Sequence, residues 1–322
     1  MRPPSFATIF ALTALALGAC DANAEPPVAA EPARASADEP RQTEGPSDSV
    51  DEPDPKPVTA ASLRDAYPWL SGMDADLQVV PLSQRFNPPA GYSRVSVGEG
   101  SFAQFLRGLP VRVDRTGVLS YRGRRLSSPS AAIVAIDVGE RNLQQCADSA
   151  IRLHAEYLWS RGEAQRLGYH FTSGDETRWE DWQKGERYVI SGSKVERVRR
   201  GAVANSHAQF RRWLDTVFMY AGTRSLRFDS QPVAGPIAPG DFFVAPGSPG
   251  HAVIVLDVAR NEDGHRVALL GQGFMPAQDL HVIRSRGDHV EDRVWFVLPK
   301  EGEKLATPSW RPFSRGQARR FE

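Results

Sequence analysis

Residues 239–258, PGDFFVAPGSPGHAVIVLDV, predict two neighbouring strands at the centre of a β-sheet. Two apolar runs, Asp241–Val244 and Ala252–Val258, are separated by a segment rich in proline and glycine, which is typical of strands joined by a turn. The turn Ser248-Pro249-Gly250 places His251 at the entrance of the second strand. The ring of His251 is therefore expected at the end of a buried apolar strand.

A third apolar run, Arg266–Gln272, follows a short polar loop and predicts a hairpin with the preceding strand. If Arg260 lies opposite His265, Gln272 falls on the same face of the sheet as His251, one diagonal step away. A shift of one residue would turn Gln272 to the opposite face. The register of this hairpin therefore determines whether the two polar side chains can meet.

Two helices are predicted upstream of these strands. Cys146 opens a helix-like segment that runs to about Ser160, where Arg161-Gly162 is a usual stop signal. The second helix, Ser206–Ala221, has an S-x-x-Q capping box and an apolar stripe at helical spacing. The stripe consists of Phe210, Trp213, Leu214, Val217 and Phe218. Helices followed by consecutive antiparallel strands indicate an α+β domain.

Cys146 is the candidate nucleophile. The chain has two cysteines, and Cys20 lies in a predicted leader, so Cys146 would be a thiol with no internal disulfide partner. A helix start offers free N–H groups and the positive end of the macrodipole, which favour a thiolate and can hold an oxyanion. Gln144 and Gln145 are candidates for a further oxyanion donor. The alternative is a small buried hydrophobic residue, the usual state of a free cysteine.

His251 is the candidate general base. A side-chain amide at Gln272 can accept a hydrogen bond from one imidazole nitrogen and hold the other nitrogen toward the thiol. Gln278 and Asp257 are the alternative orienting residues. The predicted catalytic residues of this thiol-histidine chemistry are Cys146, His251 and Gln272.

The order of these residues resembles the NlpC-type cysteine peptidases of the papain-like superfamily. Pro239-Gly240-Asp241 before an apolar run, followed by Gly250-His251-Ala252-Val253-Ile254-Val255, is similar to the hairpin of that family. The family signature is a cysteine at a helix start, a histidine at a strand start and a polar residue on the next strand. The resemblance implies a papain-like core of helices packed on an antiparallel sheet, with an N-terminal elaboration. The chain departs from the family in having Gln145 where an aspartate usually precedes the cysteine.

Further motifs resemble an uncharacterised family of bacterial lipoproteins, a domain of unknown function. They are QQCADS at 144–149, FMYAGT at 218–223, PGHAVIVLD at 249–257 and FMPAQ at 274–278. The similarity covers most of residues 60–315. It implies a family domain without an established activity.

The N-terminus resembles a lipoprotein leader. A basic residue precedes a short apolar run that ends in Leu17-Gly18-Ala19-Cys20, which is similar to the bacterial lipobox. This resemblance implies a signal peptide over residues 1–20 and a lipid anchor at Cys20, with palmitate as an attached acyl group. Cleavage after Ala22-Asn23-Ala24, which would release a soluble periplasmic protein, is the alternative.

The rest of the chain divides by composition. Residues 21–58 are rich in Pro, Ala and acidic residues and predict a disordered linker, because they cannot bury enough apolar surface to offset the entropy of ordering. Residues 59–300 predict a single globular domain, and residues 301–322 a C-terminal tail. Residues 1–58 carry ten acidic and four basic residues, so the zero net charge of the whole chain leaves about +6 on the remainder.

The sequence contains no motif typical of a metal site, a nucleotide cofactor site or a nucleic-acid-binding module. The seven histidines are scattered, with no H-E-x-x-H, no C-x-x-C and no phosphate-cradling glycine motif, so neither a metal nor a cofactor is predicted. Nothing resembles a nucleic-acid-binding module. The basic runs Lys194–Arg200 and Arg311–Arg320 are expected to be solvated loop or tail.

Aromatic residues between the proposed nucleophile and base are candidates for substrate binding. Trp179, Trp182 and His170 could line a groove for a glycan or peptide, and core packing is the alternative for the tryptophans. Asp148 and Arg152, four residues apart, are expected to pair on the helix surface.

Together these features predict a bacterial cell-envelope lipoprotein that is membrane-anchored through Cys20 and faces the periplasm. Its predicted activity is that of a thiol hydrolase, a cysteine peptidase or amidase, acting on amide or peptide bonds. Peptidoglycan stem peptides are a candidate substrate, and acyl or peptidyl transfer would use the same machinery. The alternative is a non-catalytic binding or scaffold lipoprotein on the same fold, with Cys146 inert.

Overall fold

A computed structural model describes residues 56–192, 194–286 and 293–322. The predicted leader with Cys20, and the linker as far as residue 55, lie outside the described residues. Helices and antiparallel strands occur together in the described residues, which confirms the α+β class. The helices are α1 (Leu82–Arg85), α2 (Phe102–Arg107), α3 (Cys146–Ser160), α4 (Trp179–Gln183) and α5 (His207–Tyr220).

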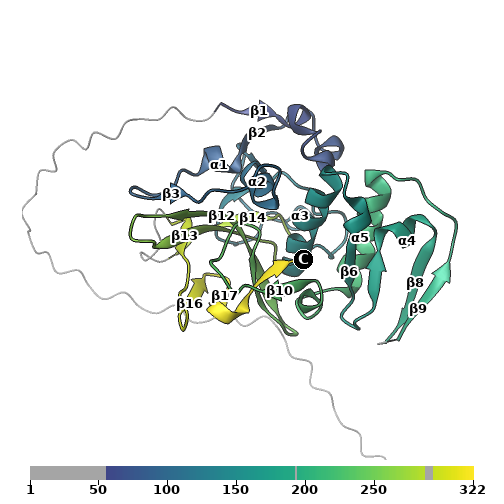
Figure 1. Ribbon diagram of the computed structural model, residues 1–322. Helices are drawn as coiled ribbons and strands as arrows, with labels where there is room; N and C mark the ends of the chain where they lie inside the picture. The colour runs from purple at the N-terminus through teal and green to yellow at the C-terminus, as the bar shows by residue number, and fades with distance from the viewer. Residues whose placement is uncertain (1–55, 193, 287–292) are drawn as a thin grey trace, which may run out of the picture. The chain divides into compact units, whose positions relative to one another are not determined.

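The main sheet has nine strands and lies in the middle of the folded part that the structure describes (Figure 1). Its strands follow the order β10-β18-β11-β12-β13-β14-β5, while β15 also pairs with β13 and β3 with β12. The bounds are β3 (Ser93–Arg94), β5 (Ser130–Ile133), β10 (Ser230–Pro232), β11 (Phe242–Ala245), β12 (His251–Arg260), β13 (Arg266–Gln272), β14 (His281–Ile283), β15 (Trp295–Val297) and β18 (Ala318–Phe321).

Smaller antiparallel sheets surround the main one. A three-stranded sheet has the order β1-β2-β4, and the pairs β6-β7, β8-β9 and β16-β17 form hairpins. Their bounds are β1 (Val58–Thr59), β2 (Gln78–Pro81), β4 (Pro110–Arg112), β6 (Gly168–His170), β7 (Glu176–Arg178), β8 (Glu186–Ser191), β9 (Lys194–Arg199), β16 (Lys304–Thr307) and β17 (Trp310–Ser314).

The two long helices begin and end where local signals predict. Helix α3 starts at Cys146, the Asp148 side chain accepts a hydrogen bond from the N–H of Gln145, and the helix stops before Gly162, which has a φ of +70°. Helix α5 starts after Ser206, whose hydroxyl accepts from the N–H of Gln209. The apolar stripe of α5 is buried, as its spacing predicts.

The main sheet has a hydrophobic core on each face. Along β12, Ala252, Ile254 and Leu256 belong to one core, which also contains the buried faces of α3 and α5. Val253 and Val255 alternate to the other core, which the β16-β17 hairpin covers with Leu305 and Phe313. Figure 1 shows α3 and α5 on one side of β12 and the hairpin β16-β17 below it.

The hairpin of β12 and β13 differs from the predicted register at its closed end. Arg260 lies opposite Arg266, so the expected pairing with His265 is wrong. A β-bulge between Val255 and Asp257 then shifts the pairing by one residue, and Ile254 lies opposite Gly271. The one-residue shift at Arg260 and the one-residue shift at the bulge are opposite in direction, so the pairing beyond the bulge is the predicted one. At that open end of the hairpin, His251 and Gln272 share one face.

Segments expected to be loop or tail contain strands. Lys194–Arg199 forms β9, and residues 301–322, expected as a tail, contain β16, β17 and β18. Strand β18 lies between β10 and β11, and Arg320 holds the buried carboxylate of Asp241 with contacts of 2.6 and 2.9 Å. Strand β18 is therefore part of the main sheet, whereas β16 and β17 form a hairpin of their own.

Candidate active site

Cys146, the first residue of α3, lines an open hollow of about 330 Å³. Cys146 is 7% exposed, so its thiol has little access to solvent. The start of α3 approaches the end of β13 so closely that a Cβ atom on Gly273 would lie 2.4 Å from the Ser149 hydroxyl. The hollow is also lined by Asn142, Gln145, Phe218, Thr223, Gly250 and Met275.

The Cys146 sulfur is a thiol in the resting structure. Burial raises the pKa of Cys146 to about 11, although the backbone N–H groups of Ala252 and Ala147 face the sulfur and oppose the rise. The expectation that a helix start would favour the thiolate is therefore corrected, because desolvation outweighs the N–H groups. The contact with the N–H of Ala252 also places the sulfur beside the residue that follows His251.

His251 is buried under aromatic side chains at the start of β12. The ring centroids of Phe274, Trp310 and Phe313 lie 4.9, 5.2 and 6.1 Å from that of the imidazole. Burial lowers the pKa of His251 to about 4, because an apolar environment disfavours the imidazolium. His251 is therefore neutral at pH 7.

A chain of hydrogen bonds fixes the tautomer of His251. The carbonyl of Asp279 can only accept, so His281 must donate from Nδ1 across 3.0 Å and keep a lone pair on Nε2. That lone pair faces the Gln272 Nε2 amide at 3.3 Å, and the same amide nitrogen donates to Ser309 Oγ at 3.0 Å. Gln272 Oε1 is then directed at His251 Nε2, 2.9 Å away, which must carry a proton.

The other nitrogen of His251, Nδ1, therefore carries a lone pair. This atom is buried and has no hydrogen-bond partner among the described residues. It does not hydrogen-bond to the Cys146 sulfur in this resting geometry. Neither His251 nor Gln272 lines the hollow at Cys146. The structure therefore joins His251 to Gln272 but shows no direct contact between His251 and Cys146.

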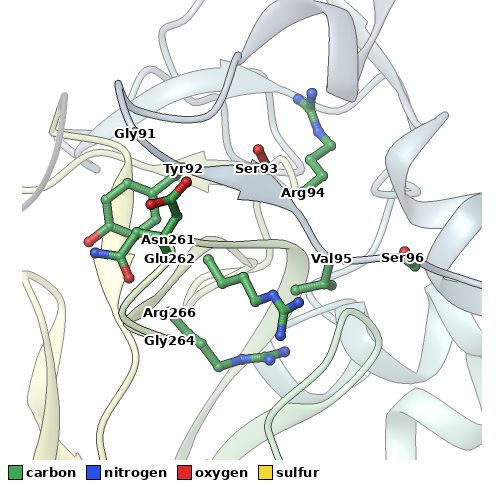
Figure 2. Close-up of a pocket in the computed structure, with 11 residues that line it drawn as sticks. Gly91, Tyr92, Ser93, Arg94, Val95, Ser96, Asn261, Glu262, Gly264 and Arg266 are labelled. Atoms are coloured by element: carbon green, nitrogen blue, oxygen red, sulfur yellow. The ribbon is translucent and has the colours of Figure 1, made fainter.

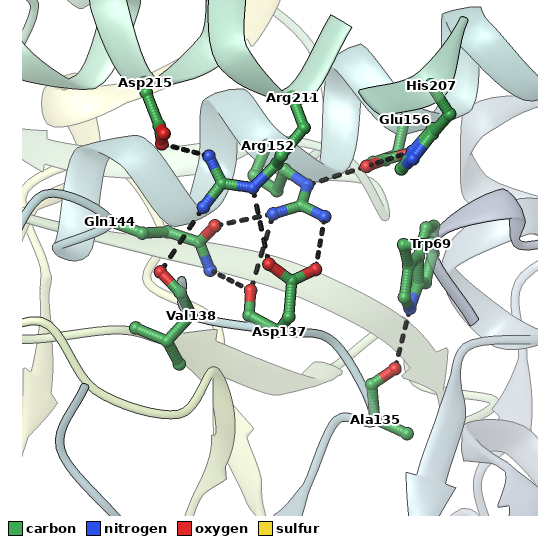
Figure 3. A network of polar contacts seen from close by, with 10 residues as sticks. All are labelled: Trp69, Ala135, Asp137, Val138, Gln144, Arg152, Glu156, His207, Arg211 and Asp215. Atoms are coloured by element: carbon green, nitrogen blue, oxygen red, sulfur yellow. Dashed lines mark hydrogen bonds and ion pairs between the residues drawn. The ribbon is translucent and has the colours of Figure 1, made fainter. Parts of the chain in front are cut away.

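A network of buried charges fixes α3 and the loop before it (Figure 3). Arg152, at 0% exposure, holds Glu156 at 2.7 Å, Asp137 at 2.8 Å and the amide oxygen of Gln144 at 2.9 Å. Glu156 also accepts from His207 of α5 at 2.9 Å. The expected pair between Asp148 and Arg152 does not form, because Arg152 points into the protein toward these acceptors. The network positions the start of α3, and hence Cys146.

The predicted substrate-binding residues lie away from Cys146. Trp179, at 0% exposure, packs against Trp159, Phe210 and Trp213, and Trp182 is 8% exposed. His170 forms a 2.6 Å contact with Asp229. None of the three predicted residues lines the hollow at Cys146, and the tryptophans adopt the core-packing alternative.

Hydrogen bonds and ion pairs decide which of the alternative orienting and oxyanion residues could act at the site. Asp257 is held by Arg94 and Arg107, and Gln278 donates to Ser128, so neither orients His251. Gln144 is committed to Asp137 and Arg152. Gln145 lines the hollow next to Cys146, and its amide nitrogen donates to Asn142 Oδ1 at 3.4 Å, which leaves one amide N–H as a candidate oxyanion donor.

Sequence reasoning missed His281, Ser309 and the aromatic cover of His251. His281 has a signal that could have been used, since it opens the apolar run His281-Val282-Ile283. Its direct pairing with Gln272 is visible only in the register of β13 and β14. Ser309 and Trp310 lie in the segment expected as tail and have no such signal.

Residues 82–320 match a family described as Domain of unknown function (4846). The chain belongs to this family. The match covers α1 through most of β18, including Cys146, His251, Gln272 and His281. No curated protein and no solved structure matches the chain.

The described residues contain neither a metal-binding cluster nor a membrane-spanning helix. Across residues 56–192, 194–286 and 293–322, no three His, Cys, Asp or Glu side chains converge as a metal site would require. The helices in the same ranges are too short or too polar to cross a bilayer.

Proposed function

We propose that this protein is a thiol hydrolase that cleaves an amide or peptide bond, with Cys146 as nucleophile, His251 as general base and Gln272 as the residue that orients His251. One observation carries the proposal. The hydrogen bonds from Asp279 through His281 and Gln272 leave His251 Nδ1 unprotonated and unpartnered, next to the residue whose N–H faces the sulfur. The papain-like resemblance of the three residues supports the same assignment.

In the proposed reaction the thiol proton passes to His251 Nδ1 as the sulfur attacks the substrate carbonyl. The oxyanion is held by N–H groups at the start of α3, with the Gln145 amide as a further donor. The carbon–nitrogen bond breaks, and Nδ1 returns the proton to the leaving amine. Water, deprotonated by Nδ1, then hydrolyses the thioester and restores the thiol.

The substrate class follows from the proposed location. We infer that Cys20 is acylated and that the linker of residues 21–58 tethers the domain to a bacterial membrane on the periplasmic side, where peptide bonds of peptidoglycan are within reach. Labelling cells with a palmitate analogue tests the anchor. The label should appear on the wild-type chain and be absent from Cys20→Ser.

The hydrolase is tested with purified cell-wall fragments and mass spectrometry of new free amines. Wild type should release amines and Cys146→Ala should release none. Val189→Ala, which changes an exposed residue of β8 outside the hollow, is the control and should retain the activity. Equal release by wild type and Cys146→Ala would refute the assignment of the nucleophile.

A non-catalytic envelope binding protein is the second candidate. The observation that favours it is the burial of both groups, which raises the pKa of Cys146 and lowers that of His251, so that no thiolate is stored at rest. In that case wall fragments would bind to wild type and Cys146→Ala equally, without release of amines.

A further inference from the structure

A second hollow, of about 820 Å³, opens at the closed end of the β12-β13 hairpin (Figure 2). It is lined by residues of the β3 segment and of the hairpin, and β12 separates it from His251 by the length of the strand. The volume is in the range of pockets that hold small organic ligands.

Two arginines lie side by side in the wall of this hollow. Arg260 and Arg266 are directly opposite in the register of β12 and β13, which brings their side chains onto one face. Like charges placed directly opposite destabilise a sheet unless something compensates them. Neither guanidinium has an ion pair among the described residues. Arg266 Nη2 donates to the carbonyl of Ile237 at 2.9 Å, and Arg266 Nε is buried without a hydrogen-bond partner.

The neighbouring charges do not provide the missing anion. Arg94 also lines the hollow, but Asp257 holds its guanidinium at 2.7 Å, and Figure 2 shows its side chain directed away from that of Arg266. Asp257 is shared with Arg107, so one carboxylate serves two arginines. Glu262 is the carboxylate that lines the hollow itself. Asp241 also acts on Arg266, but it is paired with Arg320 at 2.6 Å. Counting both members of that pair, five guanidiniums against three carboxylates leave a surplus of two positive charges.

The basic character continues beyond Arg266. The same residue lines a smaller hollow, of about 110 Å³, together with Lys300 and Arg315. Arg315 donates to the carbonyls of Val233 and Gly235 rather than to a carboxylate. The positive surplus is therefore a property of this end of the sheet and not of one side chain.

We propose that the hollow between β3 and the β12-β13 hairpin binds a phosphate monoester, with Arg260 and Arg266 as its ligands. A dianionic phosphate matches the charge surplus, and its oxygens suit two guanidinium forks. Tyr92 and Asn261 line the remainder of the hollow and would contact the organic part of the ligand. This inference is independent of the thiol chemistry at Cys146.

The test measures binding of glycerol phosphate by calorimetry in a Cys20→Ser chain, which cannot be acylated. Wild type should bind saturably and more weakly as salt is raised. Arg260→Gln and Arg266→Gln should each weaken binding by at least about tenfold, as expected for loss of a charged hydrogen bond. Arg212→Gln, which removes an exposed arginine of α5, should leave the affinity unchanged. Arg260 is itself exposed, so its variant reports on binding even if Arg266→Gln fails to fold.

Vesicles distinguish the source of the phosphate. Binding to phosphatidic acid vesicles but not to phosphatidylcholine vesicles, lost in Arg260→Gln, would identify a lipid headgroup, whereas binding of soluble glycerol phosphate alone would identify a free ligand. The proposal is overturned if neither probe binds, or if binding persists unchanged in both arginine variants.

Discussion

Asp148 provides a prediction that depends on burial alone. Asp148 is 5% exposed, one carboxyl oxygen accepts the N–H of Gln145 at 3.0 Å, and the other, Oδ1, is buried without a partner. Burial raises the pKa of Asp148 from 3.8 to about 8. Asp148→Asn keeps an oxygen for the Gln145 N–H and removes the titration.

The sign and size of the effect follow from this pKa. Between pH 4 and pH 8 the folded protein keeps a proton on Asp148 that the unfolded chain has released. The contribution of Asp148 to the free energy of unfolding therefore falls by about 1.4 kcal/mol for each pH unit as pH rises through this window. Relative to wild type, Asp148→Asn should gain about 3 kcal/mol between pH 5 and pH 7.

Urea unfolding of wild type and Asp148→Asn at pH 5, 6 and 7 measures this difference. Asp76→Asn, which changes an exposed carboxyl, is the matched control and should follow wild type at each pH. A stability difference between wild type and Asp148→Asn that stays constant across the three pH values would refute the assignment of a protonated buried carboxyl.

Three further predictions concern the site and the network behind it. Burial holds the pKa of His251 near 4 and raises that of Cys146 to about 11, so between pH 6 and pH 9 the base stays neutral and the sulfur stays a thiol. The rate at which iodoacetamide alkylates wild type should therefore vary by less than about threefold over this range. A reaction limited by free thiolate would instead rise about tenfold per pH unit. His281→Phe removes the acceptor that orients the Gln272 amide, so the alkylation rate at pH 7 should fall about fivefold, and an unchanged rate would separate His281 from the site. Arg152→Met leaves the buried Glu156 short of a partner and should lower the free energy of unfolding by about 3 kcal/mol in urea, with a loss below about 1 kcal/mol contradicting the role of the network.

The sequence predicted the elements that carry a strong local signal. The bounds of α3 and α5 follow from their caps, and the length of β13 follows from one apolar run. Residues 304–321 were missed because their strands are short and rich in arginine, and β18 depends on pairing with β10 and β11 far away in the chain. Local periodicity contains no information about such pairing.

The candidate site was only partly predictable. His251 and Gln272 were expected to share one face, and they do. The predicted register was nevertheless wrong at Arg260, and a β-bulge that the sequence does not indicate restores it. The raised pKa of Cys146 could not be predicted, because the helix start is visible in the sequence whereas the depth of burial is not. The depth of burial also decides the role of Trp179, which is fully buried and therefore packs in the core and does not contact a ligand.

The central claim is that His251 removes the proton of Cys146 when the sulfur reacts. The most direct measurement is the rate of iodoacetamide alkylation of Cys146 at pH 6 in wild type, His251→Ala and the exposed-histidine control His265→Ala. His251→Ala should react on the order of 100-fold more slowly than wild type, whereas His265→Ala should react at the wild-type rate. Equal rates in wild type and His251→Ala would contradict it.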